Sequence, residues 1–101
     1  MISLVITTCK NNREAEKLSN MLLKKKLSAC VKNQKIKSSY WWKGKIEKSN
    51  EILLTAVVNK SKVESVMEAI RKNHSYEVPE IIEVPVGRAG ESYWRWVLSV
   101  E

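Results

Sequence analysis

Residues 29–58, ACVKNQKIKSSYWWKGKIEKSNEILLTAVV, decide the fold, because they predict one long β-hairpin. Its arms are residues 29–42 and 45–58, and Lys43-Gly44 joins them as a two-residue link. Each arm has around fourteen residues, whereas a usual strand has about 5–6. Arms of this length overhang a small domain and leave unpaired backbone donors and acceptors along their edges. A second copy of the chain is the simplest cover for those edges.

The residues before the hairpin predict a strand and a helix. Alternating apolar residues in 2–7 indicate a strand that is buried largely on both faces. Asn11 followed by Glu14 resembles a capping box, and apolar residues then recur at helical spacing. The first helix is therefore expected over about residues 12–26.

The residues after the hairpin predict a helix, a strand and a short terminal helix. Ser61 and Glu64 have the spacing of a capping box. The apolar residues that follow recur at helical spacing and form one face, namely Val63, Val66, Met67 and Ile70. Two prolines bracket the next expected strand, residues 80–84, and both suit its ends or an edge position. A short helix is expected from Glu91 onward.

The order of these elements is strand, helix, strand, strand, helix, strand and a terminal helix. This is the α+β ferredoxin-like pattern, βαββαβ, with a four-stranded antiparallel sheet and both main helices on one face. A chain of 101 residues has room for one core. Residues 1–101 are therefore expected to form a single domain.

The composition indicates a globular protein with a basic surface. Lys and Arg number 18 against 11 acidic residues, all of them Glu, and the net charge is +7. A basic patch would suit nucleic acid or another anionic partner, but the lysines are spread along the chain and are interpreted as a solvated coat. No segment approaches the roughly 20 apolar residues that span a membrane, and the N-terminus lacks the basic flank of a signal peptide. A cytoplasmic protein that binds no nucleic acid is expected.

The sequence contains few residues that could form a catalytic site. His74 is the single histidine, aspartate is absent, and none of the common nucleophile, metalloprotease or phosphate-loop motifs occurs. Glu77, Glu80 and Glu83 could pair for acid–base chemistry, but their positions in and near a strand favour solvent-facing alternation. The chain is not expected to be an enzyme.

Cys9, Cys30 and His74 are the only plausible soft metal ligands. Thiol and imidazole donors suit copper and similar ions, although two thiols and one imidazole do not supply the four ligands of a structural zinc site. Alternatively, Cys30 is a small buried hydrophobic residue, and His74 interacts with the C-terminal end of the second helix. Copper or another divalent cation is therefore a candidate ligand, and no cofactor is certain.

The aromatic residues at the hairpin turn, Tyr40, Trp41 and Trp42, allow two interpretations. Beside Lys43 and Lys45 they could form a stacking platform for single-stranded nucleic acid. However, adjacent strand residues point to opposite faces, so Trp41 and Trp42 cannot stack along one face. Large aromatics are enriched in the buried centres of interfaces. We therefore expect at least one indole to pack against protein.

Three blocks of residues resemble the CutA family of divalent-cation tolerance proteins. They are ACV at 29–31, YWWKGKI at 40–46 and HSYEVPEI at 74–81. Thr7-Thr8 and the pair Tyr93 and Trp96 also fit the family pattern. The resemblance covers essentially the whole chain, and the last two blocks are specific when they occur together.

The resemblance implies a ferredoxin-like fold assembled as a homotrimer, with long hairpins that pair across subunits. It also implies a shape similar to the PII signalling proteins, with clefts between subunits, and it supplies no catalytic residue. Family members are associated with tolerance to divalent metals and with copper binding. The residues expected to pack between subunits are Tyr40, Trp41, Trp42 and Trp96, and the cleft candidates that match the family are Glu51, Tyr76, Glu77 and Glu80.

Several positions depart from the family pattern. Lys32 replaces a common asparagine, Val57 a common lysine and Ser75 a proline. A polar cleft that depends on the family's asparagine and lysine would therefore have Lys32 and Val57 in their place. Some members have a metal-binding cysteine at the position of Thr7, whereas this chain has Cys9 two residues later.

The sequence thus predicts a trimeric, non-catalytic protein of divalent-metal response, copper in particular, that binds metal or a small ligand in clefts between subunits. The alternative is a structural or regulatory trimer, similar to PII, whose partner is another protein and for which metal is incidental.

Overall fold

The computed structural model describes residues 1–100, which form one four-stranded sheet with three α-helices. Element boundaries differ from the expected ones by a few residues at most, since helix and strand ends depend on local capping. The elements in chain order are β1 (Ile2–Cys9), α1 (Asn12–Lys24), β2 (Cys30–Trp42), β3 (Lys45–Asn59), a 3₁₀ turn (Lys60–Lys62), α2 (Val63–Asn73), β4 (Ile81–Pro85) and α3 (Glu91–Ser99).

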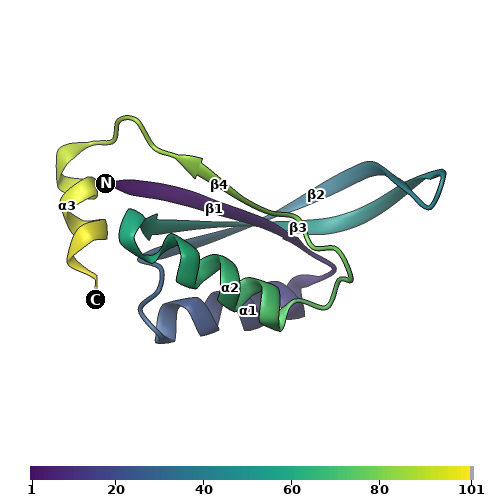
Figure 1. Ribbon diagram of the computed structural model, residues 1–101, viewed down its shortest axis with the longest axis horizontal. Coiled ribbons are helices and arrows are strands. Elements are labelled where there is room, and N and C mark those ends of the chain that lie inside the picture. The colour runs from purple at the N-terminus through teal and green to yellow at the C-terminus, as the bar shows by residue number, and fades with distance from the viewer. Residues whose placement is uncertain (101) are drawn as a thin grey trace.

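The sheet has the strand order β2-β3-β1-β4, and every neighbouring pair is antiparallel. Helices α1 and α2 lie side by side against one face, and α3 lies at the end of the sheet away from the hairpin turn (Figure 1). This arrangement confirms the predicted ferredoxin-like βαββαβ fold with a short C-terminal helix.

Two apolar clusters lie on the two faces of the sheet. The larger one joins α1 and α2 to the strands through fully buried residues such as Val5, Leu18 and Leu54. The smaller one joins α3 to the opposite face, where Ile2 and Val57 pack with Val97. Successive strand residues point to opposite faces, so β1 is buried on both faces as predicted.

The hairpin extends beyond the rest of the sheet, as Figure 1 shows at its right-hand end. β3 pairs with β1 only from Ile52 to Asn59, whereas its pairing with β2 continues to Lys45 at the turn. Lys43 and Gly44 both have positive φ, 51° and 79°, which is the two-residue turn geometry that matches the twist of hairpin strands. The molecule measures 44 × 25 × 21 Å as a result.

Of the two predicted helix N-caps, the one at the start of α1 is present, whereas the prediction of a cap at the start of α2 is wrong. Asn11 caps α1, since its side chain accepts the Glu14 N–H at 2.9 Å. The box at Ser61 does not form, because α2 begins at Val63 and has no side-chain cap. The Oδ1 atom of Asn59 accepts both the N–H and the hydroxyl of Ser61, and this arrangement produces the 3₁₀ turn instead.

Candidate functional site

The candidate site lies where β1 ends, α1 begins and α2 ends (Figure 1). It contains Cys9 from the end of β1, Glu14 from the first turn of α1, and His74 from the residue that follows α2. One donor atom from each side chain lies within 4.8 Å of the other two. The structure thus brings together two of the three predicted metal ligands and adds Glu14, which the sequence had marked only as a capping residue.

His74 has hydrogen-bond partners at both ring nitrogens. Its Nε2 lies 2.8 Å from the carbonyl oxygen of Thr8, and its Nδ1 accepts the backbone N–H of Tyr76 at 3.1 Å. A carbonyl oxygen only accepts, so Nε2 carries the proton, and this assignment makes the ring neutral. The side chain is fully buried. His74 therefore fastens the segment after α2 to the end of β1.

Glu14 is a buried carboxylate held by backbone donors. Its Oε1 accepts the N–H of Lys10 at 3.0 Å, and its Oε2 accepts the N–H of Ser75 at 2.8 Å. Burial raises the pKa of Glu14, but the hydrogen bonds from Ser75 and Lys10 outweigh it, so the net shift is downward. The carboxylate is therefore ionised at neutral pH.

Ser75 owes its contact with Glu14 to a departure from the family pattern. A proline at this position has no backbone N–H, so it could not donate to Oε2 of Glu14 as Ser75 does. Serine in place of proline therefore adds a partly buried hydrogen bond to the carboxylate of Glu14.

Cys9 is fully buried between the sheet and the helices. Burial, followed by the negative charges of Glu14 and Glu51, raises the pKa of its thiol to about 12. The thiolate is the form that attacks electrophiles and binds metals. At neutral pH Cys9 is therefore a protonated thiol, and it is neither an activated nucleophile nor a ready metal ligand.

The donor set still fits a soft or borderline divalent ion in type and in spacing. Thiolate, imidazole and carboxylate are ligands that copper and zinc accept. To bind such an ion, Cys9 would release its proton, and Nδ1 of His74 would exchange the N–H of Tyr76 for the metal. Cation binding in this cluster is consequently coupled to proton release.

Cys30, the third predicted ligand, lies in another part of the molecule. It packs against the smaller apolar cluster beneath α3 and is partly exposed, so it is less buried than the small buried hydrophobic residue considered from the sequence. Cys30 pairs with Val57 across the sheet, whereas Cys9 pairs with Ile52. These partners are five residues apart on β3, which corresponds to roughly 17 Å. Cys30 does not belong to the cluster of Cys9, Glu14 and His74.

Two of the four cleft candidates meet beside this cluster. The Tyr76 hydroxyl donates to Oε2 of Glu51 at 2.6 Å, and the Tyr76 ring lies 4.9 Å from the His74 ring, centroid to centroid. Burial, followed by the hydrogen bond to Glu51, raises the pKa of Tyr76. Glu77 and Glu80 are exposed on the segment that leads to β4.

The four residues expected to pack between subunits are all exposed in the single chain. The exposed fraction is 71% for Trp41 and 46% for Trp96, and Tyr40 and Trp42 are exposed by 42% and 38%. Trp41 and Trp42 lie on opposite faces of the hairpin, opposite Ile46 and Lys45 respectively. These aromatic side chains therefore leave apolar surface of the single chain in contact with water.

The two residues that depart from the family pattern near the expected cleft have different environments. Lys32 is exposed on β2. Val57 is 4% exposed and belongs to the apolar cluster with Ile2 and Val97, so it is a core residue rather than part of a polar site. Its replacement of a lysine is therefore explained by packing against α3.

Comparisons with known proteins agree with this fold. The family model described as CutA1 divalent ion tolerance protein matches residues 3–100. The chain belongs to the CutA1 divalent ion tolerance family. The divalent-cation tolerance protein CutA of Archaeoglobus fulgidus is 34% identical over 97 residues, which cover 96% of this chain and 95% of that protein. The solved structure of the CutA protein from Archaeoglobus fulgidus, a protein described there as periplasmic, has a TM-score of 0.96 at 33% identity, and the match covers 99% of this chain and 98% of that one.

Other CutA proteins are comparably similar. CutA1 of Pyrococcus horikoshii has a TM-score of 0.91 at 35% identity, covering 97% of this chain and 95% of that one. The CutA homolog of Xenopus laevis is 38% identical over 97 residues, which are 95% of this chain and 64% of that protein. The chain thus spans under two thirds of the length of several animal relatives. Within residues 1–100, no helix is long and apolar enough to cross a membrane.

Proposed function

We propose that this chain works as a homotrimer without catalytic activity in the response to divalent cations, copper among them. The observation that carries the proposal is the overhanging hairpin, whose aromatic residues at the turn remain 38% to 71% exposed. A hairpin edge that is left unpaired invites pairing with another chain. The family membership supports the role in divalent ion tolerance.

The absence of catalysis is proposed from the chemistry of the two candidate reactive groups. A Cys9 thiol with a pKa near 12 does not supply a thiolate at neutral pH. His74 uses both ring nitrogens in contacts with backbone groups, so it has no free position from which to accept a proton from a substrate.

For the cation itself, the proposed ligands are Cys9, Glu14 and His74. Within residues 1–100, they form the one group of three Cys, His or acidic side chains whose donor atoms lie within 4.8 Å of one another. The hydrogen-bonded pair of Tyr76 and Glu51 lies beside this group. In a trimer, the exposed Glu77 and Glu80 would add charge to a neighbouring cleft, where a small ligand is the second possible occupant. We propose that the protein is located in a reducing compartment such as the cytoplasm, where its two free cysteines remain thiols.

Calorimetric titration with Cu(II), and with Cu(I) under reducing conditions, tests the cation site. The wild type should bind stoichiometrically, with affinity that rises between pH 6 and pH 8 because the metal displaces a proton. Cys9→Ser and His74→Ala should abolish the heat signal. Cys30→Ser is the matched control, since it removes a thiol that lies outside the cluster. A flat titration, or equal loss in Cys30→Ser, would contradict the assignment.

The second candidate function is a regulatory trimer whose partner is another protein. The observation in its favour is that Glu14 and His74 already link β1, α1 and the segment after α2 through hydrogen bonds, so these two residues have a structural role without metal. A flat copper titration together with an intact trimer would favour this function over the first.

A further inference from the structure

A cavity of about 570 Å³ lies where α1 begins and α2 ends. The buried side chains of Glu14 and His74 form part of its wall, and the rest of the wall comes from four basic and three neutral polar residues. Sites for small molecules usually have volumes of about 300–1,000 Å³. The cavity is therefore large enough for a small ligand.

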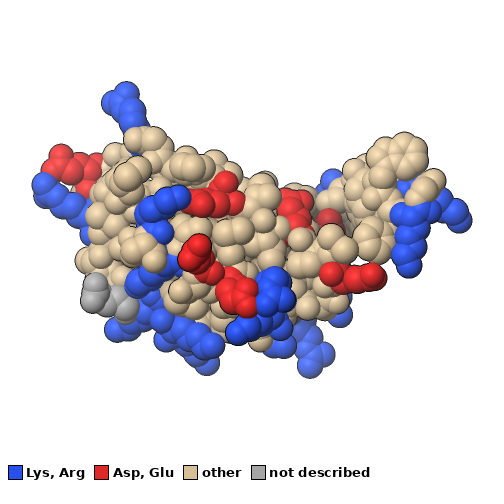
Figure 2. Space-filling view, in the orientation of Figure 1, with Lys and Arg blue, Asp and Glu red and all other residues tan. Residues whose placement is uncertain are grey.

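The four basic residues of this wall come from both helix ends. Arg13 and Lys17 lie four residues apart, so they share one face of α1. Lys10 lies just before the same helix, and Lys72 belongs to the last turn of α2. Figure 2 shows basic side chains along the lower border of the molecule, where Figure 1 places these two helices. Four cationic side chains thus surround a single cavity.

The protein supplies little negative charge to balance these cations. Within residues 1–100, Lys10, Arg13 and Lys17 take part in no ion pair. Lys72 lies 3.8 Å from a carboxylate oxygen of Glu68, but that carboxylate already accepts two hydrogen bonds from a neighbouring arginine. The positive charge at the cavity is therefore available to a ligand.

Among the described residues that line the cavity, Glu14 is the acidic one. Its two oxygens accept the backbone N–H groups of Lys10 and Ser75, and its side chain is 7% exposed. His74 is neutral, because its Nε2 donates to a carbonyl oxygen and its Nδ1 accepts an N–H. The cavity therefore carries an excess of positive charge.

The two helix ends at the cavity have opposite partial charges. The first turn of α1 has N–H groups without intrahelical partners and is the positive end of its dipole. The last turn of α2 is a negative end. However, the side-chain amide of Asn73 donates to the carbonyl oxygen of Ala69 at 2.8 Å, and Lys72 lies in the same turn. These groups offset the negative end of α2, so the cavity stays basic.

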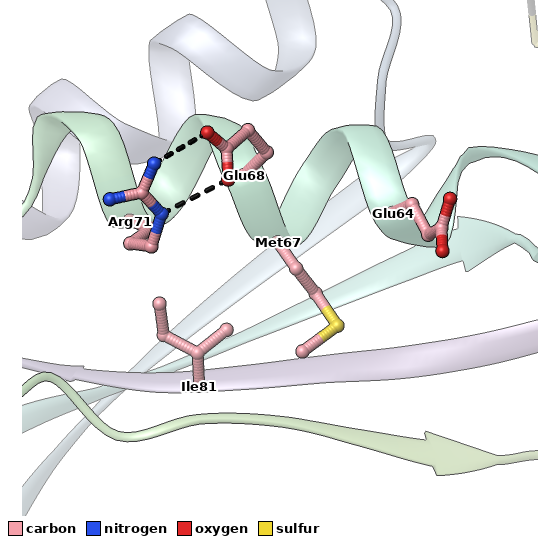
Figure 3. A pocket seen from close by; sticks show the side chains of 5 residues that line it. All are labelled: Glu64, Met67, Glu68, Arg71 and Ile81. Atoms are coloured by element: carbon pink, nitrogen blue, oxygen red, sulfur yellow. Dashed lines mark hydrogen bonds and ion pairs between the residues drawn. The ribbon is translucent and has the colours of Figure 1, made fainter.

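The cavity between α2 and β4 has a different character (Figure 3). Met67 and Ile81 give it an apolar floor, and Glu64 lies on its helix side. Its arginine, Arg71, makes two hydrogen bonds with Glu68. The cation of that cavity is therefore already paired, in contrast to the cations at the start of α1.

The side chains of the basic cavity indicate the class of ligand. A guanidinium group binds phosphate or carboxylate through two parallel hydrogen bonds, and an ammonium group adds a point charge. The ring of His74 is fully buried, and the other lining residues are polar or charged. The wall thus offers no aromatic surface on which a nucleobase could stack. A compact, hydrophilic anion suits it best.

We propose that this cavity binds a compact anion with several phosphate or carboxylate groups, held by Lys10, Arg13, Lys17 and Lys72. The site adjoins the proposed cation ligands but takes a ligand of opposite charge, and it does not depend on metal binding. A bound anion would reduce the mutual repulsion of the four cations. It would therefore stabilise the folded chain.

Calorimetric titration of the metal-free protein with tripolyphosphate, and separately with citrate, tests this site. The cavity variant carries Arg13→Gln with Lys17→Gln. The matched control carries Lys24→Gln with Lys25→Gln, which makes the same charge change on exposed positions at the other end of α1. Circular dichroism checks the folding of both variants. Amide chemical shifts in the wild type, recorded with and without tripolyphosphate, locate the bound anion.

The wild type should bind one anion per chain, and the larger affinity of the two anions shows whether the site prefers phosphate or carboxylate. The dissociation constant should rise at least about tenfold in the cavity variant and less than about twofold in the control, since charge-assisted hydrogen bonds are the strong ones. Binding should weaken with added NaCl. The shift changes should centre on residues 10–17 and 72–75.

Three results would overturn the proposal. Equal weakening in the two variants would mean that the anion binds to the lysine coat as a whole. Shift changes centred elsewhere would place the bound anion outside this cavity. The absence of both heat and shift changes with either anion would show that the cavity does not bind such ligands.

Discussion

Two regions along the β2–β3 hairpin differ in how completely their own chain covers them. Beside the middle of β3, the side chains of Cys9, Glu14 and His74 are buried. Both ring nitrogens of His74 and both carboxylate oxygens of Glu14 have hydrogen-bond partners. At the turn, Trp41 and Ile46 are 71% and 61% exposed. The first region is completed by its own chain, whereas the second leaves apolar side chains exposed that the proposed trimer would cover. Changes in the first should therefore affect folding, and changes in the second should affect assembly.

The largest effect is expected from truncating the indoles at the turn. Trp41→Ala and Trp42→Ala should weaken trimer assembly by about 3–5 kcal/mol each, the cost of removing an aromatic ring from a buried site. The helical signal of the subunit should persist, because neither ring belongs to its core. Sedimentation over a dilution series measures the effect, and Lys48→Ala on the same hairpin is the control. An unchanged dissociation midpoint in both variants would mean that the rings stay in solvent.

The next effect concerns folding. His74→Ala leaves the Thr8 carbonyl and the Tyr76 N–H without their partner, and an unsatisfied buried group costs about 1–3 kcal/mol. The free energy of unfolding should fall by about 3 kcal/mol in urea denaturation. Lys72→Ala, two residues before His74 and exposed, should change it by less than about 0.5 kcal/mol. Equal stabilities would show that the cluster does not fasten the fold.

A smaller effect is expected at Ser75. Ser75→Pro removes the N–H that Oε2 of Glu14 accepts, at a cost of about 1–2 kcal/mol, whereas Ser75→Ala keeps that N–H. The pKa of Glu14 is lowered in the folded protein, so its stabilising effect is present above the ordinary glutamate pKa of about 4.3 and is lost as the pH falls through the folded value. Acid unfolding followed by circular dichroism should be less steep in Ser75→Pro. Identical acid profiles in both variants would refute the role of the N–H.

The smallest effect is chemical and leaves the structure intact. Burial and the nearby carboxylates raise the pKa of the Cys9 thiol to about 12, so native Cys9 should react with iodoacetamide at pH 8 at least a hundredfold more slowly than in urea. Mass spectrometry of the labelled peptides measures both rates. Rapid labelling of Cys9 in the native protein would mean that the end of β1 opens readily.

The sequence was sufficient for the features that depend on local pattern. Alternation and helical spacing predicted the element order, and the arms of the hairpin were placed to within one residue at their outer ends. The Ser61 cap failed because Asn59, at the end of β3, competes for the Ser61 hydroxyl and N–H. Such competition between neighbouring polar side chains is invisible to a spacing rule.

The candidate site was predicted less completely, because it depends on contacts between distant segments. Cys9 and His74 were selected by residue type and do meet, but Cys30 was grouped with them although its strand position puts it beneath α3. Glu14 was recognised only as part of a cap. Its closeness to Cys9 could have been inferred from the short link between the end of the first strand and the start of the first helix. The contact of His74 with β1 joins residues 66 positions apart, and no local pattern encodes it.

Size-exclusion chromatography with light scattering tests the central claim most directly. We expect a single species of about three times the 11.6 kDa chain mass at micromolar concentration. A stable species of 11.6 kDa under the same conditions would contradict it.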